Sequence, residues 1–296
     1  MPTTAERNGL RATSQGLLCT GARLALDHHR PRYGRLLAEV AAGVRADPKT
    51  LCSAPTAAQL GPKARPLVLP WHVPLTLGRV AVALAPAGSG LGSAAALLHT
   101  GRATVADLRW ARPDALWPFE APQLPEAAIA VLDADRAVQR SATAAGLFAA
   151  LVEVVAAGAQ TIAAADAVVA AQLALWLRVH GAGCVGSPAV ARVLRGWQRA
   201  GVAVAGLRGR GAVRVATTAE LPLADWHVAD AATAQSTDFV FSRYAVGPAL
   251  GELVAACQAR EVLAVGKSVA SLSSLLPPTV AVWHLQAPAQ LRLDDV

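Results

Sequence analysis

Three glycines in one short loop are the first residues whose spacing points to chemistry. Gly88, Gly90 and Gly92 follow the apolar run at 78–85 and precede the run AAALLHTG at 94–101. If the first run is a strand and the second a helix, backbone N–H groups of the loop could cradle a phosphate or a nucleotide cofactor at the helix N-terminus. No Gly-Lys-Ser/Thr follows, and no acidic residue stands at dinucleotide-binding spacing. A tight left-handed turn is therefore the competing interpretation.

The other candidates for proton chemistry are one thiol and several carboxylates. Cys184 ends an apolar run, where it is either a functional thiol or a small buried residue. Carboxylates that could include a general base stand beside the apolar runs at Asp166, Asp225, Asp230 and Asp238. Aspartate at the end of a strand is commonly a helix cap or a turn former, so these positions have two interpretations.

The histidines and cysteines do not form a metal-binding pattern. His180 and His227 have no carboxylate partner at ligand spacing, and the four cysteines contain no Cys-x-x-Cys pair. No Gly-x-Ser-x-Gly elbow marks a serine nucleophile. The sequence predicts no metal site and no cofactor, and the absence of a disulfide framework predicts a reducing intracellular compartment.

Basic residues outnumber acidic ones. The chain carries 27 Lys and Arg against 20 Asp and Glu, which gives a formal net charge of +7 and a pI near 9.9. That balance can indicate a nucleic-acid or acidic-lipid partner. Here the basic residues are spread along the chain and only 4% of residues are aromatic, so a nucleic-acid partner is not expected. No run is long and apolar enough to predict a membrane span.

The elements that must position these groups are clearest between residues 181 and 267. Short apolar runs alternate there with amphipathic segments, the runs lying near 182–185, 202–207, 226–229, 238–242 and 261–265. Runs of four to six apolar residues bounded by Gly, Asp or Ser are typical of parallel strands buried on both faces. The sequence predicts an α/β fold with a Rossmann-like, mainly parallel C-terminal sheet covered by helices on both faces and connected in right-handed order.

The N-terminal part is predicted to be helical and peripheral. YGRLLAEVAAGV at 33–44 has helical spacing, five prolines within 53–74 predict an irregular connector, and 127–178 predicts two or three helices. We divide the chain into a basic arm and helix (1–65), a helical and irregular part with one strand and the glycine-rich turn (66–158), and a Rossmann-like domain (159–296). The arginine-containing, acid-poor residues 1–30 are either an organellar targeting segment, mitochondrial in type, or a retained arm of a cytoplasmic protein.

Over residues 160–285 the order of elements resembles a known family. GCVGS at 183–187, WHVADAA at 226–232 and DFVF at 238–241 are similar to the C-terminal half of the family that includes the regulatory subunits of eukaryotic translation initiation factor 2B, methylthioribose-1-phosphate isomerase and ribose-1,5-bisphosphate isomerase. The resemblance implies a helical part followed by a Rossmann-like part. In the isomerases a Cys and an Asp do the proton chemistry. Cys184 stands where that Cys is expected, and Arg208 is the residue that could replace the family's strand-end Arg.

The chain departs from the family where that chemistry is done. The Asp expected after the run at 238–241 is missing, because the chain reads SRYA at 242–245. A Cys without an opposed acid or base cannot move a proton between two carbons. The sequence therefore predicts a non-catalytic structural or regulatory subunit whose partners are other protein subunits. The alternatives are a sugar-phosphate isomerase, with Cys184, Asp230 and Arg208 as candidate catalytic residues and a small phosphate compound as ligand, or the regulatory subunit of a nucleotide-exchange factor.

Overall fold

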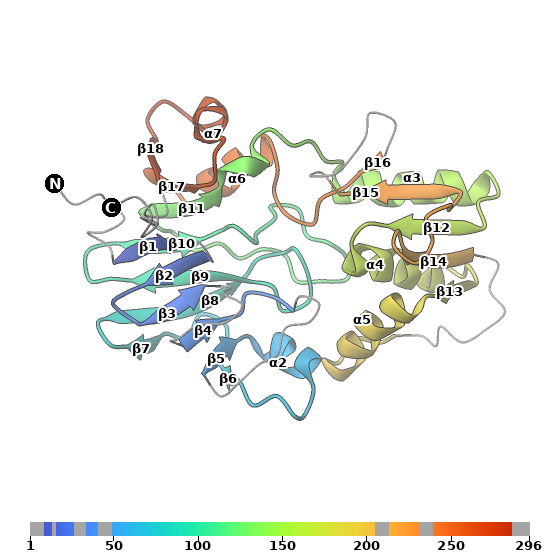
Figure 1. The fold of residues 1–296 in the computed structure, drawn as a ribbon, viewed down its shortest axis with the longest axis horizontal. Coiled ribbons are helices and arrows are strands. Elements are labelled where there is room, and N and C mark those ends of the chain that lie inside the picture. The colour runs from blue at the N-terminus through green and yellow to red at the C-terminus, as the bar shows by residue number, and fades with distance from the viewer. Residues whose placement is uncertain are drawn as a thin grey trace, which may run out of the picture.

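Three sheets form the framework of the molecule in this computed structural model, which describes residues 9–13, 16–26, 34–40, 49–204, 213–230 and 239–285. Two sheets face each other in one half, and a third, parallel sheet lies in the other half with helices packed against it (Figure 1). The α/β class predicted from the sequence is confirmed. The predicted helical N-terminal part is wrong, because the described residues before position 53 form strands.

The first sheet uses strands in the order of the chain. They are β1 (Leu10–Thr13), β2 (Gly16–Cys19), β3 (Leu24–Leu26), β4 (Gly34–Leu36), β5 (Thr50–Cys52) and β6 (Leu67–Val68). β1 to β3 pair antiparallel, and β3 to β6 pair parallel. The helix predicted over 33–44 is replaced at 34–36 by β4. Helical spacing over so few residues does not distinguish a helix from a strand that is paired on both sides.

The proline-rich connector predicted over 53–74 contains a short helix, α2 (Ala54–Leu60). Pro55 lies in its first turn. Backbone N–H groups of the first turn have no acceptor within the helix, so a proline there removes no helical hydrogen bond. The side chain of Ser53 caps the helix by accepting a hydrogen bond from the backbone N–H of Thr56 at 3.3 Å. Prolines that argued against regular structure are thus compatible with a helix start.

The second sheet combines strands from residues 75–133 with strands from residues 261–284. Its order is β18 (Ala281–His284), β17 (Glu261–Val265), β11 (Ile129–Asp133), β10 (Thr104–Asp107), β9 (Ala94–His99), β8 (Val80–Pro86) and β7 (Leu75–Leu77). The strand predicted at 78–85 is confirmed as β8. The helix predicted at 94–101 is wrong, because those residues form β9, which pairs antiparallel with β8.

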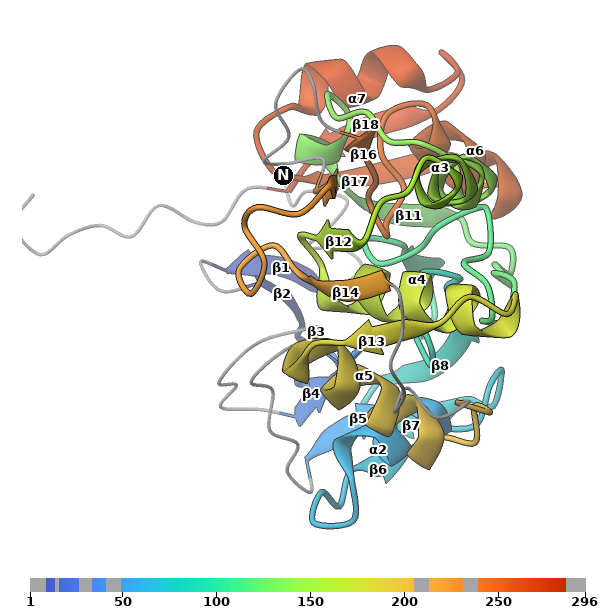
Figure 2. The same cartoon turned by 90° about the vertical axis from the view of Figure 1, so that its right-hand side faces the viewer.

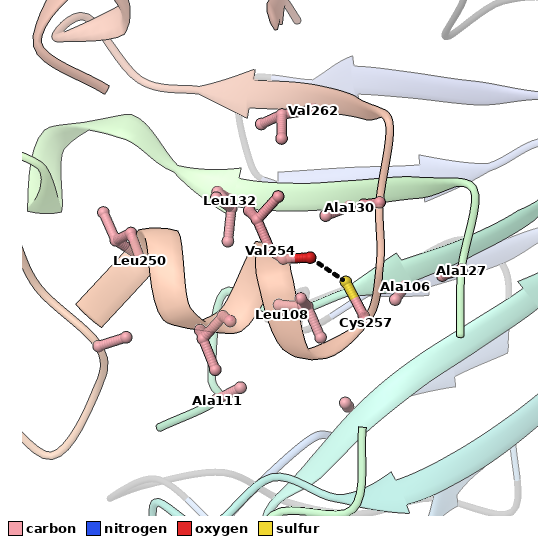
Figure 3. Close-up of a cluster of buried hydrophobic side chains, with 14 of the residues drawn as sticks. Ala106, Leu108, Ala111, Ala127, Ala130, Leu132, Leu250, Val254, Cys257 and Val262 are labelled. Carbon is pink, nitrogen blue, oxygen red and sulfur yellow. Dashed lines mark hydrogen bonds between the residues drawn. The ribbon is translucent and has the colours of Figure 1, made fainter. Parts of the chain in front are cut away.

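Alternate residues of the second sheet enter two different cores. Val82 and Leu84 face the first sheet, whereas Ala83 and Ala85 face α6 (Ala249–Ala256) and α7 (Val269–Leu275). Figure 3 shows the second core, where Cys257 lies beside Leu108 and Ala130 and its thiol donates to the carbonyl of Val254 at 3.5 Å. Burial on both faces explains why β8 and β9 are continuous apolar runs.

The parallel unit has the strand order β13 (Cys184–Gly186), β14 (Val213–Thr217), β12 (Thr161–Ala164), β15 (Trp226–Ala229) and β16 (Phe239–Val240). Its helices are α3 (Ala144–Ala156), α4 (Ala167–Val179) and α5 (Pro188–Arg199). Strands predicted near 182–185, 226–229 and 238–242 lie in this sheet, in parallel pairing. The described part of the run predicted at 202–207 is not a strand, and β14 was not predicted.

The parallel unit is an insertion into the second sheet. β11 pairs directly with β17, although α3 to α6 and the whole parallel sheet lie between them in the chain. The strand predicted at 261–265 exists, but it belongs to the second sheet and not to the Rossmann-like sheet to which the sequence assigned it. Figure 2 shows the inserted unit from its outer side, with α5 beside α2. There the guanidinium of Arg199 donates to the carbonyls of Ala58 and Gln59.

Candidate functional site

The carboxyl ends of the parallel strands meet the two-sheet half of the molecule, and this junction is the candidate site. Asp166 follows β12, and Arg243 follows β16. Glu39 reaches the same place from the segment after β4. Ligand sites in open parallel sheets usually lie at this edge, so the groups gathered here decide what the protein can do.

Arg243 is the centre of a buried ionic network. Its Nε donates to Oδ2 of Asp166 at 2.6 Å, and its two terminal nitrogens donate to the carboxylate of Glu39 at 3.1 and 3.3 Å. The side chains of Arg243 and Glu39 are each 9% exposed. Burial by itself lowers the pKa of the guanidinium, but the two carboxylates outweigh it and raise the pKa well above its ordinary value. Arg243 is therefore a permanent cation that is shared by both carboxylates.

Tyr244 and Arg136 extend the network. The Tyr244 hydroxyl accepts a hydrogen bond from Arg243 at 2.9 Å and donates one to Glu39. Burial and the neighbouring Glu39 carboxylate raise the pKa of this phenol, so it stays protonated. The guanidinium of Arg136 lies 4.2 Å from the centre of the Tyr244 ring and 5.4 Å from that of Trp110, and it forms an ion pair with Asp133 at 3.3 Å. Burial lowers the pKa of Arg136.

Two further ion pairs lie on either side of Trp110 in the chain. Arg109 and Asp107 are joined at 2.6 Å and are both nearly buried. Arg112 pairs with Asp114 at 2.6 Å and donates to the carbonyl of Ser242, which ties the segment after β10 to the segment after β16. Each of these acids has a cation of the same chain within ion-pair distance.

The helix N-termini at this edge hold carboxylates of the chain itself. The N–H of Ala144 in α3 donates to Asp114 at 2.8 Å, and the N–H of Val168 in α4 donates to Asp166 at 2.6 Å. In α5 the N–H of Ala189 donates to Glu220 at 3.0 Å. A helix N-terminus is a natural anion site; at these three an internal carboxylate occupies the position of an anionic ligand.

Glu220 is the most completely bound of these carboxylates. Besides the N–H of Ala189, it accepts from the Ser187 hydroxyl at 2.5 Å and from the Thr217 hydroxyl and N–H at 2.8 and 3.2 Å. Its slight burial raises the pKa, but the hydrogen bonds from Ser187, Ala189 and Thr217 outweigh this and lower the pKa to about 2. The carboxylate is ionised throughout the neutral range.

The loop with Gly88, Gly90 and Gly92 joins two antiparallel strands, so the helix required for a phosphate cradle does not follow it. The N–H of Gly90 donates to the Ser93 hydroxyl at 3.0 Å. The carbonyl of Gly92 accepts from the hydroxyls of Ser53 and Thr56 at 2.7 and 2.9 Å. Gly88 and Gly92 have φ of +79° and +74°, as the left-handed turn interpretation predicts. The loop packs on the start of α2.

Of the candidate catalytic residues that the structure describes, Cys184 and Asp230 are not brought together, because β14 and β12 lie between their strands. Cys184 is fully buried in the core of the parallel unit, and its thiol donates to the carbonyl of Ala174 at 3.2 Å. Burial raises the pKa of this thiol to about 11, so it is protonated at neutral pH. Asp230 is half-buried directly after β15, and Arg208 lies outside the described residues.

Of the residues that do meet, Asp166 was a candidate carboxylate in the sequence and caps α4, whereas Glu39, Arg243, Tyr244 and Arg136 were not candidates. SRYA at 242–245 stood out only as a departure from the family pattern. Arg and Tyr directly after an apolar run in a parallel unit were the available signal for a strand-end site. Glu39 gave no such signal, because its place was assigned to a helix.

Among the described residues, no group of three or more His, Cys, Asp or Glu side chains could hold a metal ion. No helix in that same part of the chain is long and apolar enough to cross a membrane.

Comparison with family models and with curated proteins gives no match for this chain. A similar solved structure is a crystal structure of a protein of unknown function from Enterococcus faecalis V583, with a TM-score of 0.56 and 9% sequence identity. The similarity covers 89% of this chain and 79% of that one, so it includes both halves of the molecule. At this identity the likeness concerns the fold alone.

Proposed function

We propose that this protein is a non-catalytic structural or regulatory subunit of a larger multiprotein assembly. The observation that carries the proposal is the Arg243 network. At the edge where a parallel sheet usually binds its ligand, Arg243 is bonded to Glu39, Asp166 and Tyr244 of the same chain. An acid or base that is held in a buried ion pair is not available to exchange a proton with a substrate.

The helix N-termini support the same proposal. A sugar-phosphate enzyme needs an anchor for its phosphate, and Glu220 occupies the N-terminus of α5 with a full set of donors. A second anion there would be repelled by the carboxylate. The buried, protonated Cys184 gives the isomerase alternative no thiolate. The resemblance to the initiation factor and isomerase family stays a prediction, and the proposed subunit role does not depend on it.

The test is the mass of the native particle. The chain is tagged at its own chromosomal locus, purified under mild conditions and measured by native mass spectrometry. We expect a particle well above the 30.3 kDa of one chain that contains other polypeptides in fixed ratio. A tagged unrelated protein of similar pI serves as the control for partners bound by charge alone.

A ligand test is run in parallel. Ribose-1,5-bisphosphate and methylthioribose-1-phosphate are added to the pure chain, and the thermal unfolding midpoint is measured. We expect no shift with either compound. A monomeric native particle, together with a midpoint that rises with sugar phosphate concentration, would overturn the proposal in favour of the isomerase.

A further inference from the structure

A second feature lies apart from the network, a pocket of about 490 Å³ that shares no residue with it. Its walls come from three places that are distant in the chain: the segment before β7, the crossing segment that runs from β10 to β11, and the last residue of α6, Ala256. The lining is apolar on most sides, formed by Pro113, Pro122, Leu124 and Pro125. His72 and Gln123 supply the polar side.

The apolar walls are preformed. A proline ring has almost no side-chain freedom to lose, so a ligand that contacts Pro113, Pro122 and Pro125 does not have to order them. Flat aromatic rings and proline rings make extended contact in protein recognition, as in grooves that bind proline-rich peptides. In this pocket the arrangement is reversed, and the rigid prolines belong to the receptor.

The polar side is also held in place. His72 has a φ of +61°, which is uncommon for a residue other than glycine, and its N–H donates to the carbonyl of Leu84 at 2.8 Å. Its Nε2 lies 3.1 Å from Oε1 of Gln123, whose own N–H donates to the carbonyl of Pro86 at 3.0 Å. These hydrogen bonds hold the Gln123 amide and the His72 imidazole beside each other at the edge of the apolar pocket. Backbone strain of this kind gathers at ligand-binding positions.

We infer that this pocket binds the side chain of a tyrosine presented by another protein subunit. The phenol ring fits the proline walls. His72 Nε2 donates to Oε1 of Gln123, which leaves the Gln123 side-chain NH2 to donate one hydrogen bond to the tyrosine hydroxyl. An apolar cavity of about 150 Å³ suffices for benzene, so a pocket of about 490 Å³ holds the ring together with adjoining backbone. The lining contains no carboxylate, lysine or arginine, which suits a neutral ligand.

The identity of the occupant as a subunit rests on the proposed function, but the pocket can be tested alone. Saturation-transfer NMR with the full chain measures binding of N-acetyl-L-tyrosinamide, N-acetyl-L-phenylalaninamide and N-acetyl-L-leucinamide. We expect the tyrosine probe to bind about 3- to 10-fold tighter than the phenylalanine probe, because one hydrogen bond separates them. The leucine probe binds more weakly than both.

Two kinds of variant assign the binding to this pocket. Ala256→Trp fills the pocket from the end of α6 and is expected to abolish binding, whereas Ala255→Trp, on an exposed neighbour outside the lining, leaves it unchanged. Gln123→Leu brings the tyrosine probe to the affinity of the phenylalanine probe. Circular dichroism confirms that each variant is folded.

Three results would overturn the inference: no saturable binding of the tyrosine probe at its solubility limit, equal binding of the leucine probe, or binding that survives Ala256→Trp. Binding of free p-cresol, a phenol without a peptide backbone, tests whether the natural ligand is a small free phenol or a tyrosine within a protein. If p-cresol binds as tightly as the blocked amide, the pocket does not use the peptide backbone and the partner assignment fails. These results come from the isolated chain, so they are distinguishable from a failure to find the chain in an assembly.

Discussion

At the scale of single residues, Arg243 is exceptional because its guanidinium is shared between the two halves of the molecule. Glu39 belongs to the two-sheet half, and Asp166 caps α4 of the inserted unit. Burying a charged triad costs desolvation energy, so such a group adds little net stability compared with an apolar replacement. Its consequence lies in specificity, because an arrangement of the two halves that removed Arg243 from this place would leave the buried Glu39 carboxylate without its cation.

The first prediction concerns the loss of that cation. Arg243→Met should lower the free energy of unfolding by about 3–5 kcal/mol, because the Glu39 carboxylate stays buried without its partner. Urea denaturation at neutral pH measures the change. Arg260→Met, on an exposed arginine, should stay within about 0.5 kcal/mol of the parent. If the two variants lose equal stability, Arg243 is not the organising charge of the junction.

The second prediction is the pH dependence supplied by Glu220. Its pKa is about 2 in the folded chain and is higher in the unfolded chain, for which the ordinary value is 4.5. The contribution of Glu220 to the free energy of unfolding is therefore complete above pH 4.5 and is lost as the pH falls toward 2. Glu220→Gln should unfold about 1 kcal/mol more easily at pH 7, as for loss of a helix cap, and this deficit should disappear as the pH falls through that window.

The matched control for Glu220 is Glu153→Gln, the same change on an exposed position of α3. Its stability should follow that of the parent at each pH. Acid titrations monitored by circular dichroism compare the three proteins. A deficit of Glu220→Gln that persists unchanged at pH 2 would contradict the assignment of the low pKa to this carboxylate.

At the scale of elements, the strands predicted best are those whose apolar runs are bounded by turn-forming residues. β8, β15 and β17 were predicted because Gly or Asp stands near each. β4 and β9 were mistaken for helices. Alanine and leucine are common in both structures, and the three residues of β4 and six of β9 are too few to reveal a period. The difference is decided by partners: β9 is paired on both sides, by β8 and β10, and tertiary pairing overrides a weak local preference.

The third prediction tests the hairpin that replaced the expected phosphate loop. A Cβ on Gly92 would lie 2.6 Å from the backbone nitrogen of Thr56, and the residue has a φ of +74°. Gly92→Ala should therefore cost more than about 2 kcal/mol of stability, through strain and separation of the loop from α2. Gly101→Ala has a similar φ of +78° but meets nothing within 4 Å, so it should cost about 1 kcal/mol. Equal costs in chemical denaturation would show that the loop is not packed as described.

At the scale of the whole molecule, the sequence predicted that a Rossmann-like unit exists but not where it ends. The prediction ran it through residue 296, because β17 follows the parallel strands with the same spacing and composition. Only the pairing of Val131 with Leu263 reveals that the chain has returned to the earlier sheet. The candidate site was lost for the same reason, since it joins Glu39 to Arg243 across 204 positions, and local patterns carry no information on such a contact.

The last prediction follows from that junction. The four described cysteines are buried, Cys184 in the inserted unit and the others in the two-sheet half. If the Arg243 network couples the halves, all four thiols of the parent should become reactive in one phase when urea is raised and a thiol reagent is pulsed, with sites assigned by mass spectrometry. In Arg243→Met, Cys184 should react at lower urea than Cys19, Cys52 and Cys257, because the inserted unit can then open by itself. The Arg260→Met control should keep the single phase. If the parent already exposes Cys184 separately, the two halves are independent domains, and the buried charges serve neither their alignment nor their cooperativity.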